Sequence, residues 1–388
     1  MSVETITLGC RLNYAESDTI AGRAHTDEDW IVINSCAVTN EAVRQTRQAI
    51  RRAHRQRPGA RILVTGCAAE LEPASFAAMP GVERVVGNAR KLNSLAADDV
   101  MPPVPAGFMG HVRSFVAVQT GCDHRCTFCS IWQARGPSVS LPFEAILDAV
   151  SREIDRGASD IVLTGVDITD FEGGLGLLCQ RLLAAEPRLR RLRLSSLDSI
   201  EIDGPLFELI AAERRLMPHF HLSLQAGDDM ILKRMKRRHS RAEAVQTVER
   251  IKTVRPDATI GADLIAGFPT ETEDMSLNSL KLLDDCDIIA AHVFPFSARP
   301  TTPAARMPQL TRELVKARAA RLRNAAAERR TRWLDSLVGT TLPVLIENGG
   351  KGHSDNFAPV AILGSQRGDL GLARIVSRDG DQLEAVWA

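Results

Sequence analysis

The chain has 388 residues, of which 44% are hydrophobic and 25% charged, and its 48 basic residues balance 48 acidic ones. This length is too great for one ordinary domain and predicts two or three, each able to bury a core. The composition is that of a soluble globular protein, and no stretch approaches the length of a membrane span. A net charge of zero favours neither a polyanionic partner nor its absence.

The compartment can be inferred from the N-terminus and the cysteines. The first residues contain no basic segment followed by an apolar run, so we expect a cytoplasmic protein that contacts no membrane. The eight cysteines would stay reduced in that compartment. Metal or cluster ligation is therefore a better explanation for them than disulfides.

The first hundred residues alternate strand-like and helix-like segments, a pattern that predicts a small parallel sheet. The strands fall at 5–8, 30–34 and 61–65, with a basic helix over 41–56. A cysteine follows each strand: Cys10, Cys36 and Cys67. Because ligands collect outside the carboxyl ends of parallel strands, these cysteines can converge on one crevice. The alternative is that they are small buried residues, but their shared position favours three thiolate ligands.

A proline-rich stretch at 101–105 predicts a linker to a second series of segments. Strand-like runs at 115–119, 161–164, 192–195, 220–224, 260–265 and 288–294 alternate with amphipathic segments. Six such units predict a partial (β/α)6 barrel, whose functional groups should lie at the carboxyl ends of the strands.

Three further cysteines, Cys122, Cys126 and Cys129, follow the first of these strands in a C-x3-C-x2-C pattern. A 4Fe-4S cluster is normally held by four thiolates, so three leave one iron open to an outside ligand. The alternative is a structural zinc ion with His124 as fourth ligand. Zinc sites usually pair two separated cysteine motifs, and no second pair follows here.

The remaining sequence contains basic clusters and a change of pattern. Arginines are concentrated at 44–57, 233–239 and 312–332, and could form a footprint for nucleic acid or simply solvated helix faces. After the arginine-rich helix, short strands at 342–346, 358–363, 371–375 and 383–387 predict a small all-β module for RNA binding or for packing.

Taken together, these motifs resemble the tRNA methylthiotransferases, which are radical S-adenosylmethionine enzymes. The resemblance rests on the segments around the six cysteines and on 194–196, 221–227, 263–272 and 292–297. It implies three domains: a methylthiotransferase domain over 1–105, a radical S-adenosylmethionine partial barrel over 108–335 and a TRAM-like RNA-binding β module over 338–388.

The resemblance also implies an activity. Arg11-Leu12-Asn13 is more similar to the branch that acts on threonylcarbamoyladenosine than to the isopentenyladenosine branch, which typically has Gln-Met-Asn there. The expected reaction places sulfur and a methyl group at C2 of that nucleoside, 3′ of the tRNA anticodon. Alternatives are isopentenyladenosine or a ribosomal protein as substrate, or a non-catalytic iron-sulfur protein that binds RNA.

The cofactors implied are two 4Fe-4S clusters and S-adenosylmethionine, with an electron donor protein of unknown identity. Cys122, Cys126 and Cys129 would hold the cluster that cleaves S-adenosylmethionine, and hence serve catalysis. Cys10, Cys36 and Cys67 would hold an auxiliary cluster. The residues expected to contact S-adenosylmethionine are Phe128, Thr164, Gly165, Ser195, Ser196, Gln225 and Asp263, although polar residues at strand ends can equally be caps.

Two departures from the family pattern affect no cysteine. Trp132 lies in the segment where the family usually has an Ile-Ile-Pro-like sequence. The stretch 17–29 is shorter than the usual helix plus strand, so the first domain is expected to lack an element.

Overall fold

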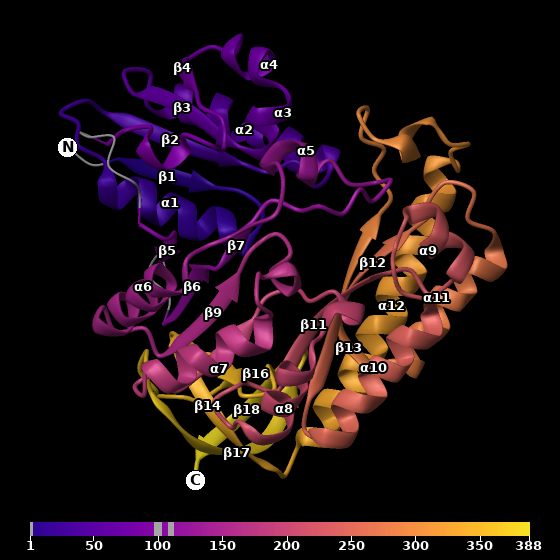
Figure 1. The fold of residues 1–388 in the computed structure, drawn as a ribbon. Helices are drawn as coiled ribbons and strands as arrows, with labels where there is room; N and C mark the ends of the chain where they lie inside the picture. The colour runs from indigo at the N-terminus through magenta and orange to yellow at the C-terminus, as the bar shows by residue number, and fades with distance from the viewer. Residues whose placement is uncertain (1–2, 97–102, 108–111) are drawn as a thin grey trace.

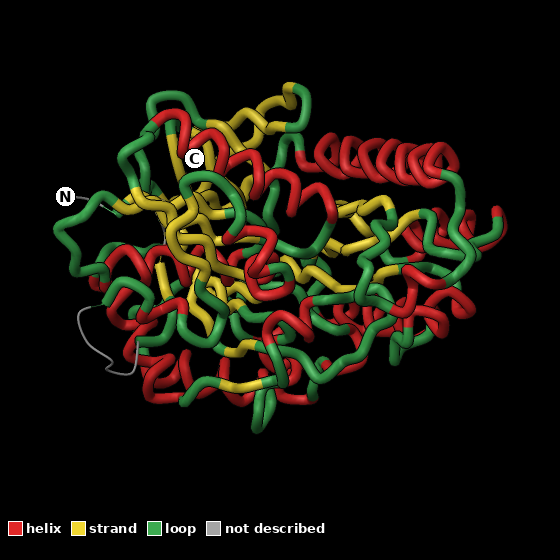
Figure 2. The backbone as a smooth tube through the Cα atoms, turned by 90° about the horizontal axis from the view of Figure 1, so that it is seen from above, coloured by secondary structure: helices red, strands yellow, loops and turns green. Residues whose placement is uncertain are grey.

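The computed structural model describes residues 3–96, 103–107 and 112–388, which form three successive parts (Figure 1). In a second view, strands occupy much of the interior and most helices lie outside them (Figure 2). The predicted linker at 101–105 lies partly outside the described residues. Within the described part, Val104 is buried against the barrel core.

The first part is a parallel sheet in the order β1-β2-β3-β4 with helices on both faces. Alternation along β2 explains this: Ile31 and Ile33 pack toward α2, whereas Trp30 and Val32 pack toward α1. β4 is a fourth strand that the sequence did not indicate. α1 ends at Arg23, so the short 17–29 stretch contains the last part of a helix. The elements are β1 (Glu4–Thr7), α1 (Arg11–Arg23), β2 (Trp30–Ser35), α2 (Asn40–Gln56), β3 (Arg61–Gly66), α3 (Cys67–Leu71), α4 (Pro73–Ala77) and β4 (Val82–Val85).

The second part contains the six predicted parallel strands β6, β9, β10, β11, β12 and β13, in two sheets. The sheet orders are β10-β9-β6-β5 and β11-β12-β13, and isolated bridges from β10 and from Leu197 join the sheets. The strands are β5 (Ala106–Gly107), β6 (Arg113–Ala117), β7 (Gln119–Thr120), β8 (Val139–Ser140), β9 (Asp160–Thr164), β10 (Leu192–Leu194), β11 (His219–Gln225), β12 (Thr259–Ala266) and β13 (Ile288–Pro295).

Helices cover the outside of this partial barrel, and α12 packs along β13 and β12. The apolar residues of the strands, such as Val116, Leu163 and Leu222, face these helices in one large core. The helices are α5 (Ile131–Arg135), α6 (Phe143–Asp155), α7 (Leu175–Ala185), α8 (Gly204–Ala212), α9 (Asp229–Met235), α10 (Arg241–Val254), α11 (Glu273–Asp285) and α12 (Arg312–Leu337).

The third part is a closed β-barrel in the order β14-β15-β16-β18-β17. Its interior is apolar, with Val344, Ile346 and Ile375 fully buried. The sequence did not indicate β15, which forms a hairpin with β14. The strands are β14 (Thr341–Asn348), β15 (Lys351–Ser354), β16 (Pro359–Ala361), β17 (Leu370–Asp379) and β18 (Gln382–Trp387).

The small barrel docks on the amino-terminal ends of the large barrel's strands. Phe357 stacks against His219 at 4.8 Å and against His353 at 4.5 Å between ring centroids. The guanidinium groups of Arg113 and Arg193 lie 5.0 and 5.2 Å from the same ring. This end of the barrel is therefore closed, which leaves the carboxyl ends of the strands, near the first domain, for chemistry (Figure 1).

Candidate active site

The loop with Cys122, Cys126 and Cys129 lies between β7 and α5, beyond the carboxyl end of β6. Gly121 has a φ of +75°, and a Cβ atom there would lie 1.7 Å from the Pro137 carbonyl oxygen, so only glycine fits. Thr127 fastens the loop to α9, because its hydroxyl donates to the Arg234 carbonyl at 2.8 Å. The loop is thus held at both its start and its middle.

The three thiols of this loop are partly or fully buried and lie near N–H donors. The Ile131 amide donates to Cys129 Sγ at 3.3 Å, and Arg237 Nη1 lies 3.8 Å from Cys126 Sγ. Burial raises the pKa of Cys122 to about 12 and that of Cys129 to about 11. Such thiols ionise readily only when a bound cation compensates the charge, and N–H donors to sulfur are typical of cluster ligands.

His124 does not complete a zinc site with these thiols. Its ring nitrogens lie 3.4 Å from Asp167, 3.6 Å from Glu201 and 3.9 Å from Asp198. The Glu201 hydrogen bond, opposed by burial, raises the pKa of His124. Among the described residues, the close group around this histidine takes in Cys122 and Asp167 but neither of the other two cysteines. A single ion bound by His124 and all three thiols does not fit this arrangement.

Cys10, Cys36 and Cys67 lie after β1, β2 and β3, where the parallel strands bring them together. Gly9 has a φ of +94°, and a Cβ atom there would lie 2.7 Å from Cys36 Sγ. Cys36 and Cys67 are buried. Cys10 is partly exposed to solvent, but many protein atoms lie around its thiol. Burial raises the pKa of Cys10, and raises that of Cys36 to about 12. The three thiols are near enough to one another that Cys10 and Cys67 also act on the ionisation of Cys36.

Arg135 connects the two cysteine sets. It is the last residue of α5, and its Nε donates to Cys67 Sγ at 3.3 Å. Its two terminal nitrogens donate to the Glu16 carboxylate at 2.8 and 3.0 Å, and one of them also donates to Asn13 Oδ1 at 2.8 Å. Lys91 also binds Glu16, and all three charged side chains are almost fully buried. The α5 helix that follows Cys129 is therefore anchored in the first domain.

The two sets are close enough to interact electrostatically. Burial is the main cause of the raised pKa of Cys129, and a thiolate at Cys67 adds to it. The short helices α3 and α5, which carry Cys67 and Arg135, pack against each other. The two cysteine sets predicted from sequence thus lie close together where the first domain contacts the barrel.

The residues expected to contact S-adenosylmethionine come from several barrel strands and from the cysteine loop. Thr164 ends β9 and is buried, Gln225 ends β11 with a φ of +67°, and Phe128 packs against the apolar cluster that contains Ala226. Gly165 follows Thr164, and a Cβ atom there would lie 2.8 Å from the Gln119 carbonyl oxygen. Ser195 and Ser196 follow β10, where the Ser195 amide donates to Leu163.

Asp263 differs from these residues because it lies in the middle of β12 and not at its end. Its carboxylate accepts hydrogen bonds from His221 at 2.9 Å and from His292 at 3.1 Å. Burial opposes its ionisation, but these two bonds prevail and lower its pKa. Gly261 makes room for the His221 ring, since a Cβ atom there would lie 2.5 Å from Nδ1. Asp263 therefore belongs to a polar cluster inside the barrel.

The sequence did not reveal the residues that hold the cysteine loop and α5 in place. Gln119 accepts from the Val166 and Asp167 amides at 3.0 and 2.9 Å and donates to the Gly121 carbonyl at 2.8 Å. It therefore joins the cysteine loop to the segment after β9. Gln119 is the last residue of the predicted strand 115–119, and that position could have marked it as a site residue. The partners of Arg135 are too distant in sequence to be predicted.

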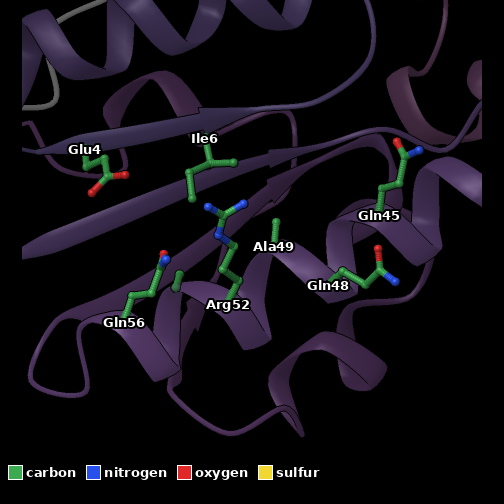
Figure 3. A pocket seen from close by; sticks show the side chains of 8 residues that line it. Glu4, Ile6, Gln45, Gln48, Ala49, Arg52 and Gln56 are labelled. Carbon is green, nitrogen blue, oxygen red and sulfur yellow. The ribbon is translucent and has the colours of Figure 1, made fainter.

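A separate hollow lies on the outside of the first domain between β1 and α2 (Figure 3). It has a volume of about 430 Å³ and is lined by Glu4, Ile6, Gln45, Gln48, Ala49, Arg52, Ala53 and Gln56. None of the cysteines lines it, so it is not part of the candidate active site.

Comparison with known protein families agrees with this division of the chain. Residues 116–283 match the model of the radical SAM superfamily, and residues 2–87 match uncharacterized protein family UPF0004. A threonylcarbamoyladenosine tRNA methylthiotransferase MtaB from Rickettsia prowazekii is 42% identical over 92% of this chain and 91% of its own length. The chain belongs to the radical S-adenosylmethionine methylthiotransferase family.

Other relatives are more distant. MtaB from Bacillus subtilis is 31% identical, over 93% of this chain and 90% of its own. A tRNA-2-methylthio-N(6)-dimethylallyladenosine synthase from Erythrobacter litoralis is 29% identical, over 89% and 86%. The solved radical S-adenosylmethionine methyltransferase TsrM from Kitasatospora setae superposes with a TM-score of 0.55 at 14% identity, covering 74% of this chain and 66% of that one, which shows a shared fold.

Membership of this methylthiotransferase family makes the protein an enzyme and implies S-adenosylmethionine and one 4Fe-4S cluster. The buried thiols with nearby N–H donors fit such a cluster. Within the described residues, no helix is long and apolar enough to cross a membrane.

Proposed function

We propose that this methylthiotransferase adds sulfur and a methyl group to C2 of threonylcarbamoyladenosine, 3′ of the anticodon in tRNA. The observation that carries the proposal is the 42% identity to MtaB from Rickettsia prowazekii, which covers 92% of this chain. A dimethylallyladenosine substrate is the second candidate, but two relatives with that name are only 29% and 30% identical.

In this proposal, Cys122, Cys126 and Cys129 hold the 4Fe-4S cluster that binds S-adenosylmethionine, and Cys10, Cys36 and Cys67 hold an auxiliary 4Fe-4S cluster. When bound, these groups supply the one-electron chemistry that opens an unactivated C–H bond, together with the sulfur and the methyl group. An electron donor protein delivers the electron. C2 of adenine carries no acidic proton, so acid-base side chains alone could not open it.

The protein's own residues position these groups. Gln119 fixes the cysteine loop to the segment after β9, and Arg135 holds α5 to the first domain through Glu16 and Asn13. We place S-adenosylmethionine along the strand ends formed by Thr164, Ser195 and Gln225, with Phe128 against its adenine. Because the small β-barrel closes the opposite end, we expect a nucleobase to enter from the side of the first domain.

The tRNA backbone would be bound by cations that the protein does not neutralise itself. In α12, Arg318, Arg321 and Arg329 form ion pairs with acidic residues of α11 or its flanks, so they are structural. In α2, by contrast, Arg51 and Arg52 are exposed and form no ion pair with the described residues. We therefore expect α2 to contribute to the phosphate-binding surface, with the TRAM-like module contacting more distant RNA.

Mass spectrometry of tRNA nucleosides tests the proposal. Cells that lack this gene should lose the 2-methylthio derivative of threonylcarbamoyladenosine and accumulate its precursor. The wild-type gene should restore it, whereas Cys126→Ala should not. Loss of the isopentenyladenosine derivative instead would favour the second candidate, and unchanged tRNA would refute both.

A further inference from the structure

Arg11 is a half-buried cation that forms no ion pair with any carboxylate of the described residues. It is the first residue of α1, directly after Cys10, and α1 packs against both β1 and β6 (Figure 1). Its guanidinium group lies 5.9 Å from the centre of the Phe115 ring on β6. The side chain thus extends from the first domain toward the barrel.

The other arginines of this interior are all neutralised. Arg113 and Arg193 each form an ion pair with Asp160, the latter at 2.8 Å. Arg191 pairs with Asp160 and with Asp355. Among the described residues, Arg11 forms no such pair: Arg113 and Arg193 act on it as like charges, while Asp263 and Asp160 attract it from beyond ion-pair distance. The guanidinium group of Arg11 therefore lies in a charged interior without a direct carboxylate contact.

The one carboxylate on the facing strands is already occupied. Asp263 Oδ1 accepts from both His221 and His292, whose rings lie 4.6 Å apart. These rings and Phe115 form a lining that is polar on β11 to β13 and aromatic on β6. A buried cation without a partner is costly, and its natural complement is an anion that arrives with the substrate.

The position next to Cys10 identifies that anion. Consecutive Cα atoms are about 3.8 Å apart, so Arg11 lies beside the proposed auxiliary cluster, where C2 of the base must be presented. C2 and C6 flank N1 in the six-membered ring, so a substituent on N6 leaves from the same edge of the base that carries C2. A threonylcarbamoyl group carries a free carboxylate there, whereas a dimethylallyl group is a hydrocarbon.

We propose that Arg11 is a specificity-determining residue that binds the carboxylate of the N6 substituent and so selects an anionic modified adenosine. This inference rests on the proposed function. The guanidinium group offers two parallel N–H donors to a carboxylate, and half-buried surroundings strengthen such a pair. The hydrocarbon substituent would leave the cation unpaired and is disfavoured.

Binding of anticodon stem-loop RNA by the cluster-containing protein tests this inference. Two RNAs are compared by fluorescence anisotropy: one with threonylcarbamoyladenosine, and one in which its carboxylate is a carboxamide. The wild type should bind the carboxamide RNA about ten- to a hundredfold more weakly. Arg11→Gln should bind both RNAs equally, and Arg11→Lys should retain part of the preference.

Arg51→Gln is the matched control, since it removes one exposed positive charge and should weaken both RNAs alike. Equal binding of the two RNAs by the wild type would overturn the inference, as would a preference that survives in Arg11→Gln. If Arg11→Gln does not fold, Arg11→Lys provides the test, because an undiminished preference in that variant would overturn the inference. Failure of the proposed function would appear separately, as unchanged nucleosides in cells that lack the gene.

Discussion

Replacing Arg135 with methionine should separate the first domain from the radical barrel. The guanidinium group donates to Glu16 twice and to Asn13 and Cys67 once each, and its side chain is 2% exposed. Lys91 remains beside Glu16 in the variant, so the carboxylate keeps one counter-charge. The cost is therefore set mainly by the lost charge-assisted bonds, and we expect about 3 kcal/mol.

Anaerobic urea unfolding of the cluster-containing protein measures this change. Arg135→Met should lower the free energy of unfolding by about 3 kcal/mol, and iron should leave the Cys10, Cys36 and Cys67 set more readily. Arg44→Met is the control, because Arg44 pairs with Glu41 on an exposed helix face and should have no measurable effect. Equal unfolding of Arg135→Met and the wild type would refute the proposed link between the domains.

Three further predictions follow from named contacts. Burial opposes ionisation of Glu16, but Arg135 and Lys91 outweigh it and lower its pKa from 4.5 to about 2. The ionised carboxylate therefore stabilises the fold fully above pH 4.5, and this stabilisation is lost as the pH falls toward 2. Unfolding measured as a function of pH should show a loss of about 3 kcal/mol over this range, and Glu16→Gln should not show it. Phe357→Ala removes two ring stacks and two cation-π contacts, so it should destabilise docking of the small barrel by about 2–4 kcal/mol and speed proteolysis near 338–340; unchanged cleavage would contradict this. Binding of tRNA should weaken steeply with salt, and Arg52→Gln should reduce the slope of log K against log [salt] by about one unit, whereas an unaltered slope would remove α2 from the RNA surface.

Regular patterns made most of the fold predictable. The six barrel strands were found because each is a short strand-like run, and amphipathic segments separate one run from the next. The positions of the cysteines after strands likewise followed from the geometry of parallel sheets. β15 was missed because Lys351-Gly352-His353-Ser354 has no apolar alternation, and only pairing with β14 makes it a strand.

The interior of the site was much less predictable. Glu16 and Arg135 are 119 positions apart, and no local pattern marks them as partners. Asp263 was expected to contact S-adenosylmethionine, and the sequence did not indicate that its carboxylate accepts hydrogen bonds from His221 and His292 inside the barrel. The basic cluster at 312–332 was also ambiguous, since only the folded chain shows that α11 neutralises several of its arginines. Contacts of this kind depend on tertiary structure.

The iron content of anaerobically reconstituted protein tests the central claim, which is that two cysteine sets each hold a 4Fe-4S cluster. The wild type should contain about eight irons per chain, and Cys36→Ala and Cys126→Ala about four each. Cys179→Ala, in a buried helix of the apolar core, should retain all of them. About four irons in the wild type, or zinc in either set, would contradict the account.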